Sequence, residues 1–226
     1  MSDAVSATEA VRAVDVVKTF DGGLIRALDG VNLVIGRSEF VAVTGPSGCG
    51  KSTLLHLIAG LDHPTSGAIH VNGRDVRQVS DVDQFRRREV GLVFQLHNLL
   101  PHLTALQNVE IAMFANGASH KEQRERAGLL LDSVGLSAKR GTEPTRLSGG
   151  ERQRLAIARA MANEPSIVLA DEPTGNLDSE AVERLLDLLD RIRRERGVTI
   201  LLVTHDSHVA AAADRIVTMR DGHIVD

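Results

Sequence analysis

A glycine-rich loop near residue 50 has the residue types and spacing of a phosphate-binding site. It matches G-x-x-x-x-G-K-[ST], follows the apolar run Phe40–Val43 and precedes the helix-forming segment Leu54–Ala59. Backbone N–H groups of such a loop converge on the β- and γ-phosphates of a nucleotide, and the following helix adds the positive end of its dipole. The predicted phosphate-binding residues are Gly45, Pro46, Ser47, Gly48, Cys49, Gly50, Lys51, Ser52 and Thr53.

Three side chains of this loop have distinct chemistry. Lys51 supplies a point charge for the β- and γ-phosphates, and the hydroxyl of Ser52 is a suitable ligand for Mg²⁺. Cys49 is the only cysteine, so the chain has no intrachain disulfide, and modification of this thiol is expected to block nucleotide entry. A tight turn between a strand and a helix is the alternative interpretation of the glycines.

Two carboxylates end the apolar run Ile167–Ala170. An aspartate at the carboxyl end of a buried strand beside a phosphate-binding loop can hold Mg²⁺ through water, which is the role predicted for Asp171. Glu172 points elsewhere because side chains alternate along a strand, so it can orient or deprotonate an attacking water. Charged residues often end strands, and the pair is informative because the phosphate-binding loop is present.

The segment Leu147–Glu151 indicates a second anion site. Ser148 is a good N-cap, and Gly149 and Gly150 leave backbone N–H groups bare at a positive helix end. A capped helix start explains the same residues. Because one phosphate-binding loop already accounts for the phosphates of a nucleotide, a second cradle predicts a second copy of the chain, arranged head to tail, whose Ser148 turn clamps the γ-phosphate.

The pattern along the chain predicts the elements that position these groups. Strands are expected at 13–17, 31–35, 40–43, 68–71, 91–94, 167–170, 199–203 and 215–219, with a turn at 72–73, and helices at 120–134, 148–162 and 180–196. This order predicts an α/β fold: a P-loop NTPase core with a RecA-like, mostly parallel sheet, a small antiparallel β part and an inserted α-helical subdomain. The whole chain, 1–226, is expected to be one domain, with its core at about 1–95 and 161–226 and the helical insertion at about 96–160.

Composition limits the functional classes. The net charge of -4 and the pI of about 6.1 do not favour a nucleic-acid partner. The basic runs 86–88 and 191–196 are interpreted as solvated helix faces. Aromatic residues are 2% of the chain, so the core is expected to be aliphatic and an aromatic that stacks on a base must be a phenylalanine. The polar start, 1–10, and the absence of an apolar run of about 18 residues predict a cytoplasmic protein.

Together the motifs resemble those of ATP-binding cassette (ABC) transporter ATPases over nearly the whole chain. The Walker A motif is 45–52, the signature motif is 147–151 and the Walker B motif is 167–172. The resemblance implies a nucleotide-sandwiched homodimer that hydrolyses ATP with Mg²⁺ and is bound to a separate transmembrane permease. The expected location is therefore cytoplasmic, on the inner face of the cell membrane through that permease.

The resemblance also implies roles for residues that carry little signal alone. Gln95 matches the glutamine that reaches Mg²⁺ and senses the membrane partner, and Asp178 belongs to the D-loop that crosses the dimer interface. His205 matches the switch histidine at the γ-phosphate, and it joins Lys51 and Glu172 as a predicted catalytic residue. Phe20 stands where the family places an adenine-stacking aromatic.

The segments 45–48, 94–101 and 170–179 are similar to the branch that contains lipoprotein-release, macrolide-export and cell-division ATPases. Gln107 stands where that branch usually has Glu, in a segment that faces the permease, so the details of coupling stay open. An ATPase that regulates a cell-division or envelope-hydrolase complex without transport is the alternative function. Soluble ABC proteins of translation or DNA repair usually carry two cassettes or a long coiled coil, which this chain lacks. The motifs do not specify the transported substrate.

Overall fold

A six-stranded sheet forms the centre of the computed structural model, which describes residues 8–114 and 116–225. Its strand order is β10-β9-β3-β8-β7-β6, and every neighbouring pair is parallel except β10 and β9. The carboxyl ends of the parallel strands therefore meet at one edge, as the mostly parallel prediction requires. The strands are β3 (Phe40–Thr44), β6 (Val90–Phe94), β7 (Ile167–Asp171), β8 (Thr199–Val203), β9 (Arg215–Arg220) and β10 (His223–Ile224).

A second, antiparallel sheet has the order β2-β1-β4-β5. Its strands are β1 (Glu9–Phe20), β2 (Ile25–Gly36), β4 (Ser66–Val71) and β5 (Arg74–Asp75). The predicted turn between β4 and β5 is confirmed, since Asn72 and Gly73 have φ values of 49° and 80°. The first two strands extend well beyond the predicted 13–17 and 31–35. Their pairing continues through several register shifts, from Glu9 opposite Gly36 to Phe20 opposite Ile25, and polar residues take part in it.

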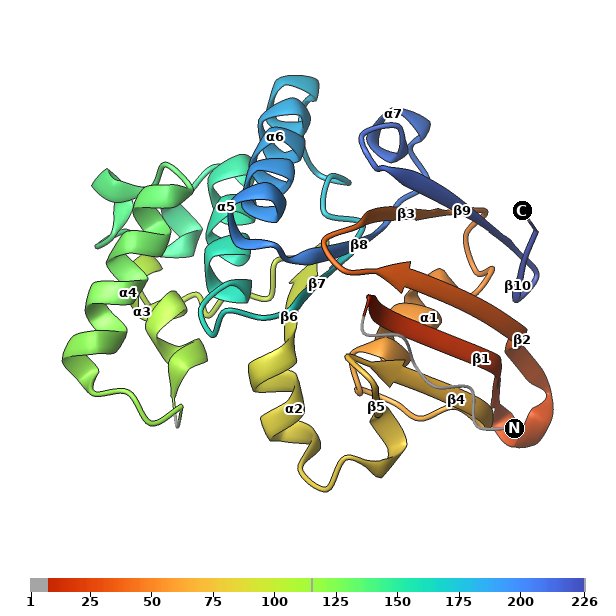
Figure 1. Cartoon of the computed structure of the whole chain (residues 1–226). Helices are drawn as coiled ribbons and strands as arrows, with labels where there is room; N and C mark the ends of the chain where they lie inside the picture. The colour runs from red at the N-terminus through yellow and green to blue at the C-terminus, as the bar shows by residue number, and fades with distance from the viewer. Residues whose placement is uncertain (1–7, 115, 226) are drawn as a thin grey trace.

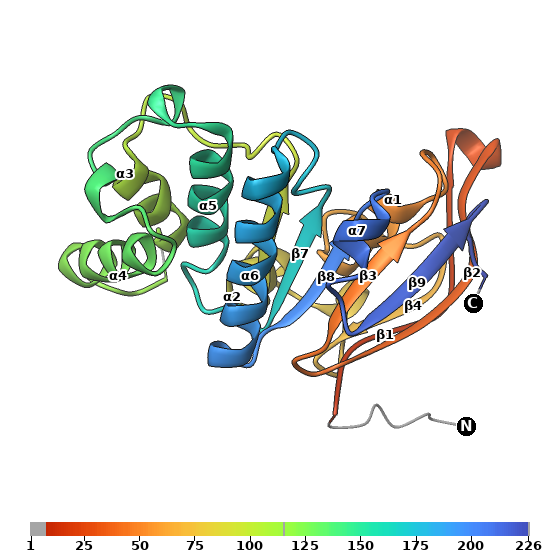
Figure 2. The same ribbon diagram turned by 90° about the horizontal axis from the view of Figure 1, so that it is seen from above.

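The predicted helices at 120–134, 148–162 and 180–196 correspond to α4, α5 and α6. In Figures 1 and 2, α3, α4 and α5 gather on one side of the parallel sheet, and the antiparallel sheet lies on the other. The insertion expected at 96–160 contains these three helices, and its boundaries stay a proposal. The helices are α1 (Lys51–Ile58), α2 (Val82–Glu89), α3 (Ala105–Glu110), α4 (His120–Ser133), α5 (Gly149–Ala160), α6 (Ser179–Arg196) and α7 (Ser207–Ala210). Short 3₁₀ turns are η1 (Asp21–Gly23), η2 (Val76–Gln78), η3 (Ile111–Met113), η4 (Ser137–Lys139) and η5 (Pro144–Arg146).

The central strands of the parallel sheet, β3, β8 and β7, are buried on both faces. Alternate residues of β7 belong to different hydrophobic clusters: Val168 and Ala170 face the helices, whereas Ile167 and Leu169 face α1 and the antiparallel sheet. The core is aliphatic, as predicted, since β-branched residues, leucine and alanine fill most of both clusters. The strand ends are thus held rigidly by packing on either side.

Burial predicts that two leucines, Leu155 in α5 and Leu129 in α4, contribute differently to stability. Leu155→Ala, at a fully buried position, should lower the free energy of unfolding by about 2–5 kcal/mol because it leaves a cavity. Leu129→Ala, on the exposed side of α4, is the matched control and should change it by no more than about 0.5 kcal/mol. Urea unfolding measures both, and equal losses would contradict the packing described.

Candidate active site

The phosphate-binding loop, 45–52, passes between strands of the two sheets. Gly45 has a φ of 142°, and a Cβ there would lie 2.1 Å from the carbonyl oxygen of Met219 in β9. Gly50 has a φ of 104°, and its Cβ would lie 2.3 Å from the carbonyl oxygen of Ala27 in β2. No side chain fits at either position. Close contacts with the backbone therefore require glycine at these two positions, in addition to the space that a phosphate needs.

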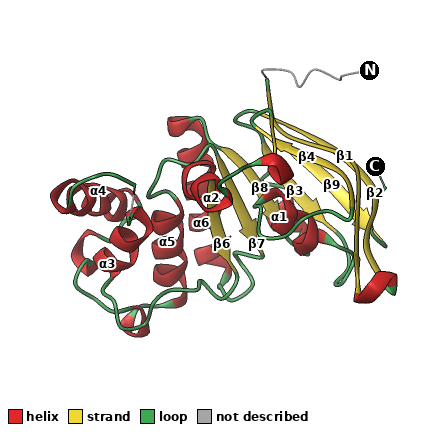
Figure 3. Cartoon of the chain, turned by 90° about the horizontal axis from the view of Figure 1, so that it is seen from below, coloured by secondary structure: helices red, strands yellow, loops and turns green. Residues whose placement is uncertain are grey.

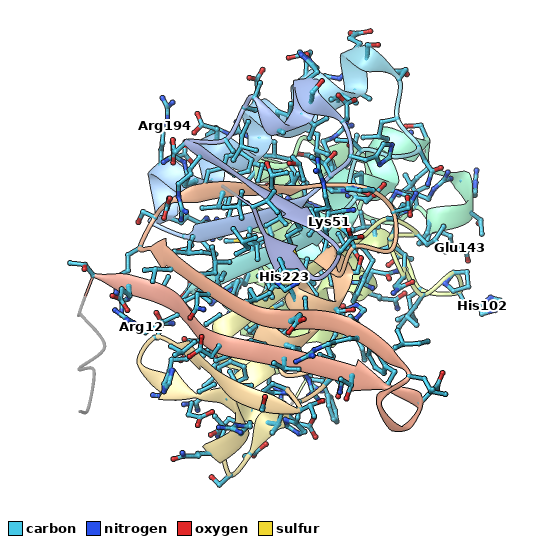
Figure 4. The ribbon with its side chains drawn as sticks, turned by 90° about the vertical axis from the view of Figure 1, so that its right-hand side faces the viewer. Arg12, Lys51, His102, Glu143, Arg194 and His223 are labelled. Carbon is cyan, nitrogen blue, oxygen red and sulfur yellow. The ribbon has the colours of Figure 1, made fainter. Side chains whose placement is uncertain are left out.

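Lys51 begins α1, and its side chain folds back to form hydrogen bonds with the loop that precedes it. Its Nζ donates hydrogen bonds of 2.8 Å to the carbonyl oxygens of both Gly45 and Pro46. The side chain is buried, and Figure 4 shows it near the turn that joins β3 to α1. The ammonium group therefore lies among the loop residues that are expected to receive phosphates.

The residues predicted to hold Mg²⁺ come from neighbouring strand ends. The Ser52 hydroxyl donates to Oδ1 of Asp171 at 3.0 Å, so two oxygen ligands of the kind that Mg²⁺ prefers lie together. Gln95 follows β6, whose last residue pairs with Asp171 in register. Its Nε2 lies 2.8 Å from where a Cβ of Gly175 would stand, which places the amide against the turn after β7.

Glu172 and His205 contact each other at the ends of β7 and β8. Nδ1 of His205 lies 2.8 Å from Oε2 of Glu172. The N–H of Glu172 donates to the carbonyl of Val203 at 3.0 Å, and its φ of 45° lies in the left-handed region that non-glycine residues rarely adopt. Asp171 and Glu172 thus contact different partners, and the contacts with Val203 and His205 hold the glutamate in this unfavourable conformation.

The Ser148 turn, Ser148–Gly150, opens α5 with a reciprocal cap. The Ser148 hydroxyl accepts from the N–H of Glu151 at 3.2 Å, and Oε2 of Glu151 accepts from the N–H of Ser148 at 2.8 Å. This N–H and the charge of Lys139 hold the pKa of the Glu151 carboxyl below its usual range. In the described part of the chain, no protein acceptor bonds the N–H of Gly149 or Gly150. Both groups stay available to an anion.

A cavity of about 940 Å³ connects the Ser148 turn with the D-loop segment. Asn176 contributes the carbonyl that would lie 3.5 Å from a Cβ of Gly149. Asp178 caps α6, because its Oδ1 accepts from the N–H of Ala181 at 2.8 Å. Figures 2 and 3 show that α5 and α1 lie on opposite sides of β7. One chain therefore separates its Ser148 turn from its own phosphate-binding loop.

Phe20, the predicted adenine-stacking residue, ends β1 and is partly exposed. The Nζ of Lys18 lies 4.9 Å from the centre of its ring, a cation–π contact. Lys18 is in turn held by Asp62, at 2.7 Å, and by the carbonyl of His63, at 2.8 Å. The cation thereby lies against one face of the ring, and the Phe20 side chain stays partly exposed.

Sequence patterns did not single out Asn108, which is completely buried in α3. Its side chain accepts from the N–H of Leu100 and donates to three carbonyls of the segment that follows Gln95, those of Leu100, Leu103 and Thr104. A lone asparagine among the buried apolar residues of a helix was the available signal, because a buried amide needs partners.

The model of the family described as "ABC transporter" matches residues 28–175. The chain belongs to the ABC transporter family. It is 44% identical over 220 residues to the lipoprotein-releasing system ATP-binding protein LolD of Bordetella avium, covering 96% of each chain. It is 47% identical to the macrolide export ATP-binding/permease protein MacB of Rhodopirellula baltica, covering 88% of this chain and 30% of that one.

Solved structures agree with this assignment. The dimeric ATP-binding cassette MJ0796, in a post-hydrolysis state bound to ADP and Pi, is 42% identical with a TM-score of 0.87, covering 96% of this chain and 97% of that one. The predicted fold class is thus confirmed, and the chain is an ATP-hydrolysing subunit of the ABC transporter family. No helix within residues 8–114 and 116–225 is long and apolar enough to cross a membrane.

The segment after Gln95 predicts a pH-dependent stability. Burial lowers the pKa of His97, and the charge of Arg152 lowers it further. The unfolded chain therefore binds a proton more readily at this residue, with a pKa of about 6.5, so acidification from pH 7 to 5 should lower the free energy of unfolding. His97→Phe should reduce this loss in urea titrations, with exposed His102→Phe as control. An unchanged pH dependence in His97→Phe would contradict the assignment.

Proposed function

We propose that two copies of the chain hydrolyse ATP as a head-to-tail dimer, in which each phosphate-binding loop is completed by the partner's Ser148 turn. The separation of these two anion sites by β7 within one chain carries the proposal. The N–H groups of Gly149 and Gly150 support it, since no protein acceptor in the described part of the chain bonds them. The relative MJ0796 is itself described as dimeric.

The geometry supports a mechanism based mainly on positioning and charge neutralisation. Lys51 and the loop amides hold the β- and γ-phosphates. Ser52 and Asp171 would hold Mg²⁺ with Gln95 nearby, and the ion would neutralise phosphate charge when bound. Glu172 orients or deprotonates the attacking water.

His205 contacts the γ-phosphate in this proposal. Its Nδ1 contact with Glu172, at 2.8 Å, orients the imidazole so that Nε2 is directed away from that carboxylate. The Ser148 turn of the partner copy supplies N–H donors to the same phosphate. These groups together surround the phosphate that is cleaved.

The proposed biological role is to drive a separate transmembrane permease in export or in mechanical work on the cell envelope. The relatives named for lipoprotein release and macrolide export support this role. In the latter, ATP-binding and permease functions share one chain, of which this chain covers 30%. Association with the inner face of the membrane would then occur through the permease. Reconstitution with the cognate permease, with ATP-dependent release or export as readout, tests this role.

The water-handling role predicts that Glu172→Gln keeps ATP binding but lowers phosphate release by roughly 10²–10³-fold, because positioning in the transition state is lost. The variant should also accumulate as an ATP-bound dimer in gel filtration. Glu180→Gln, an exposed carboxylate on α6, is the matched control and should behave as wild type. Near-normal turnover by Glu172→Gln would assign the role to another residue.

The composite site predicts that Gly149→Glu abolishes hydrolysis and leaves ATP binding by the monomer intact. Its backbone φ is ordinary and the nearest atom to a Cβ is 3.5 Å away, so the chain should fold, whereas the new carboxylate meets the partner's γ-phosphate. Gly141→Glu, with no atom within 4 Å of its Cβ, is the control. Mixing Gly149→Glu with Lys51→Ala should restore some activity, since one composite site is then intact. Wild-type turnover by Gly149→Glu alone would refute the dimer mechanism.

A further inference from the structure

Arg159, near the carboxyl end of α5, binds the backbone of the segment that follows Gln95. Its guanidinium donates to the carbonyl of His97 at 2.7 Å and to that of Asn98 at 2.5 Å. Among the described residues, no carboxylate forms an ion pair with Arg159, and burial lowers its pKa. A partly desolvated guanidinium whose polar contacts are two successive carbonyls acts as a bidentate clamp on the chain.

The clamped residues have an unfavourable backbone. His97 and Asn98 have φ values of 62° and 49°, in the left-handed region that costs non-glycine residues energy. Hydrogen bonds from the N–H of His97 to Phe94, at 3.0 Å, and from the N–H of Asn98 to Leu96, at 2.7 Å, close the turn. Such a turn persists only when its surroundings fix it, and Arg159 supplies two of the contacts that do so.

A second set of bonds continues this attachment. Asn108 binds the backbone at Leu100, Leu103 and Thr104, so the segment 97–104 is fastened to both α5 and α3. Gln95 precedes the fastened segment, and its amide lies on Gly175 in the turn between β7 and α6. The position of Gln95 therefore depends on where α5 holds the residues immediately after it.

Helix α5 carries the Ser148 turn at its other end. Arg159 follows Ser148 by eleven positions, which at 1.5 Å per residue is roughly 17 Å of rigid helix. In the proposed dimer, the Ser148 turn contacts the partner's nucleotide, whereas Gln95 serves the nucleotide on its own chain. One helix thus contacts elements of both sites.

We propose that Arg159 is a positioning residue that fixes Gln95 relative to the signature helix and so links the two nucleotide sites of the dimer. The inference rests on the proposed function, because only a head-to-tail dimer assigns the Ser148 turn to the partner's nucleotide. Its local part, the dependence of Gln95 on Arg159, lies within one chain and is testable without dimerisation.

Arg159→Lys is the informative variant, since it keeps the charge and the aliphatic stem but one ammonium group cannot reproduce the planar fork. The Mg²⁺ concentration for half-maximal ATP turnover should rise roughly three- to tenfold, and ATP affinity measured without Mg²⁺ should stay unchanged. Gln95→Ala should give the same shift. The double variant should need no more Mg²⁺ for half-maximal turnover than Gln95→Ala alone, because both changes remove the same positioned amide, that of Gln95. Arg194→Lys, on the exposed side of α6, is the control. In Figure 4, Arg194 and His102, a residue of the segment 97–104, lie on opposite sides of the view.

Hydrogen exchange of the isolated chain supplies the second measurement. Amides of 95–104 should exchange faster in Arg159→Lys than in wild type, whereas those of β7 should not change. The proposal is overturned if the effects of Arg159→Lys and Gln95→Ala on the Mg²⁺ requirement are additive. It is also overturned if Arg159→Lys lowers only the melting temperature and leaves the Mg²⁺ dependence unchanged, or if amide exchange of 95–104 is unchanged. If the wild-type protein hydrolysed ATP without dimerising, the proposed dimer would be wrong. The hydrogen-exchange measurement would still decide whether the position of Gln95 depends on Arg159.

Discussion

The phosphate-binding loop is compressed between carbonyl oxygens of two different sheets, and this close approach determines the rest of the site. A Cβ at Gly45 would collide with Met219 at 2.1 Å, and a Cβ at Gly50 with Ala27 at 2.3 Å. The first contact comes from the parallel sheet and the second from the antiparallel sheet. The loop therefore adopts one path, and α1 begins with Lys51 in one place. The small antiparallel sheet is in this sense part of the nucleotide site, although it contributes few chemical groups.

Parallel strands bring the remaining groups to the same edge. β7 and β8 end in register, so the adjacent residues Asp171 and Glu172 lie close to His205, although His205 comes from a distant part of the chain. The strained φ of Glu172 and its contact with His205 direct the glutamate away from the Ser52–Asp171 pair. The residue proposed to hold a cation, Asp171, and the one proposed to act on the attacking water, Glu172, are thus separated by a single peptide unit. The start of α5, which is proposed to bind an anion, lies on the other side of β7 from the phosphate-binding loop and α1.

Features with a local cause were predictable from the sequence. The strand–loop–helix around Lys51, the cap at Ser148 and the arginine-rich end of α6 each depend on neighbouring residues, and the structure has all of them. Helix α2 was not predicted, because Phe85 is its one buried residue and no apolar period exists. The cap by Asp81 was the available signal.

Contacts between distant segments were beyond sequence reasoning. The grip of Arg159 on residues 97 and 98 joins positions about sixty apart, and nothing in local propensity specifies it. The catalytic and ligand roles of the individual residues stay predictions, since geometry shows which groups meet and kinetics must show what they do. Phe20 is one example: Lys18 contacts its partly exposed ring, and base stacking by this ring stays a prediction.

The central claim is that the active species is a dimer whose sites are each shared by two chains. The most direct measurement is ATP turnover per chain over a protein dilution series, with the dimer fraction determined by sedimentation in the same samples. Turnover per chain should follow the fraction of ATP-bound dimer and fall toward zero as the protein becomes monomeric. A sample that sediments as monomer and retains full turnover per chain would contradict the account.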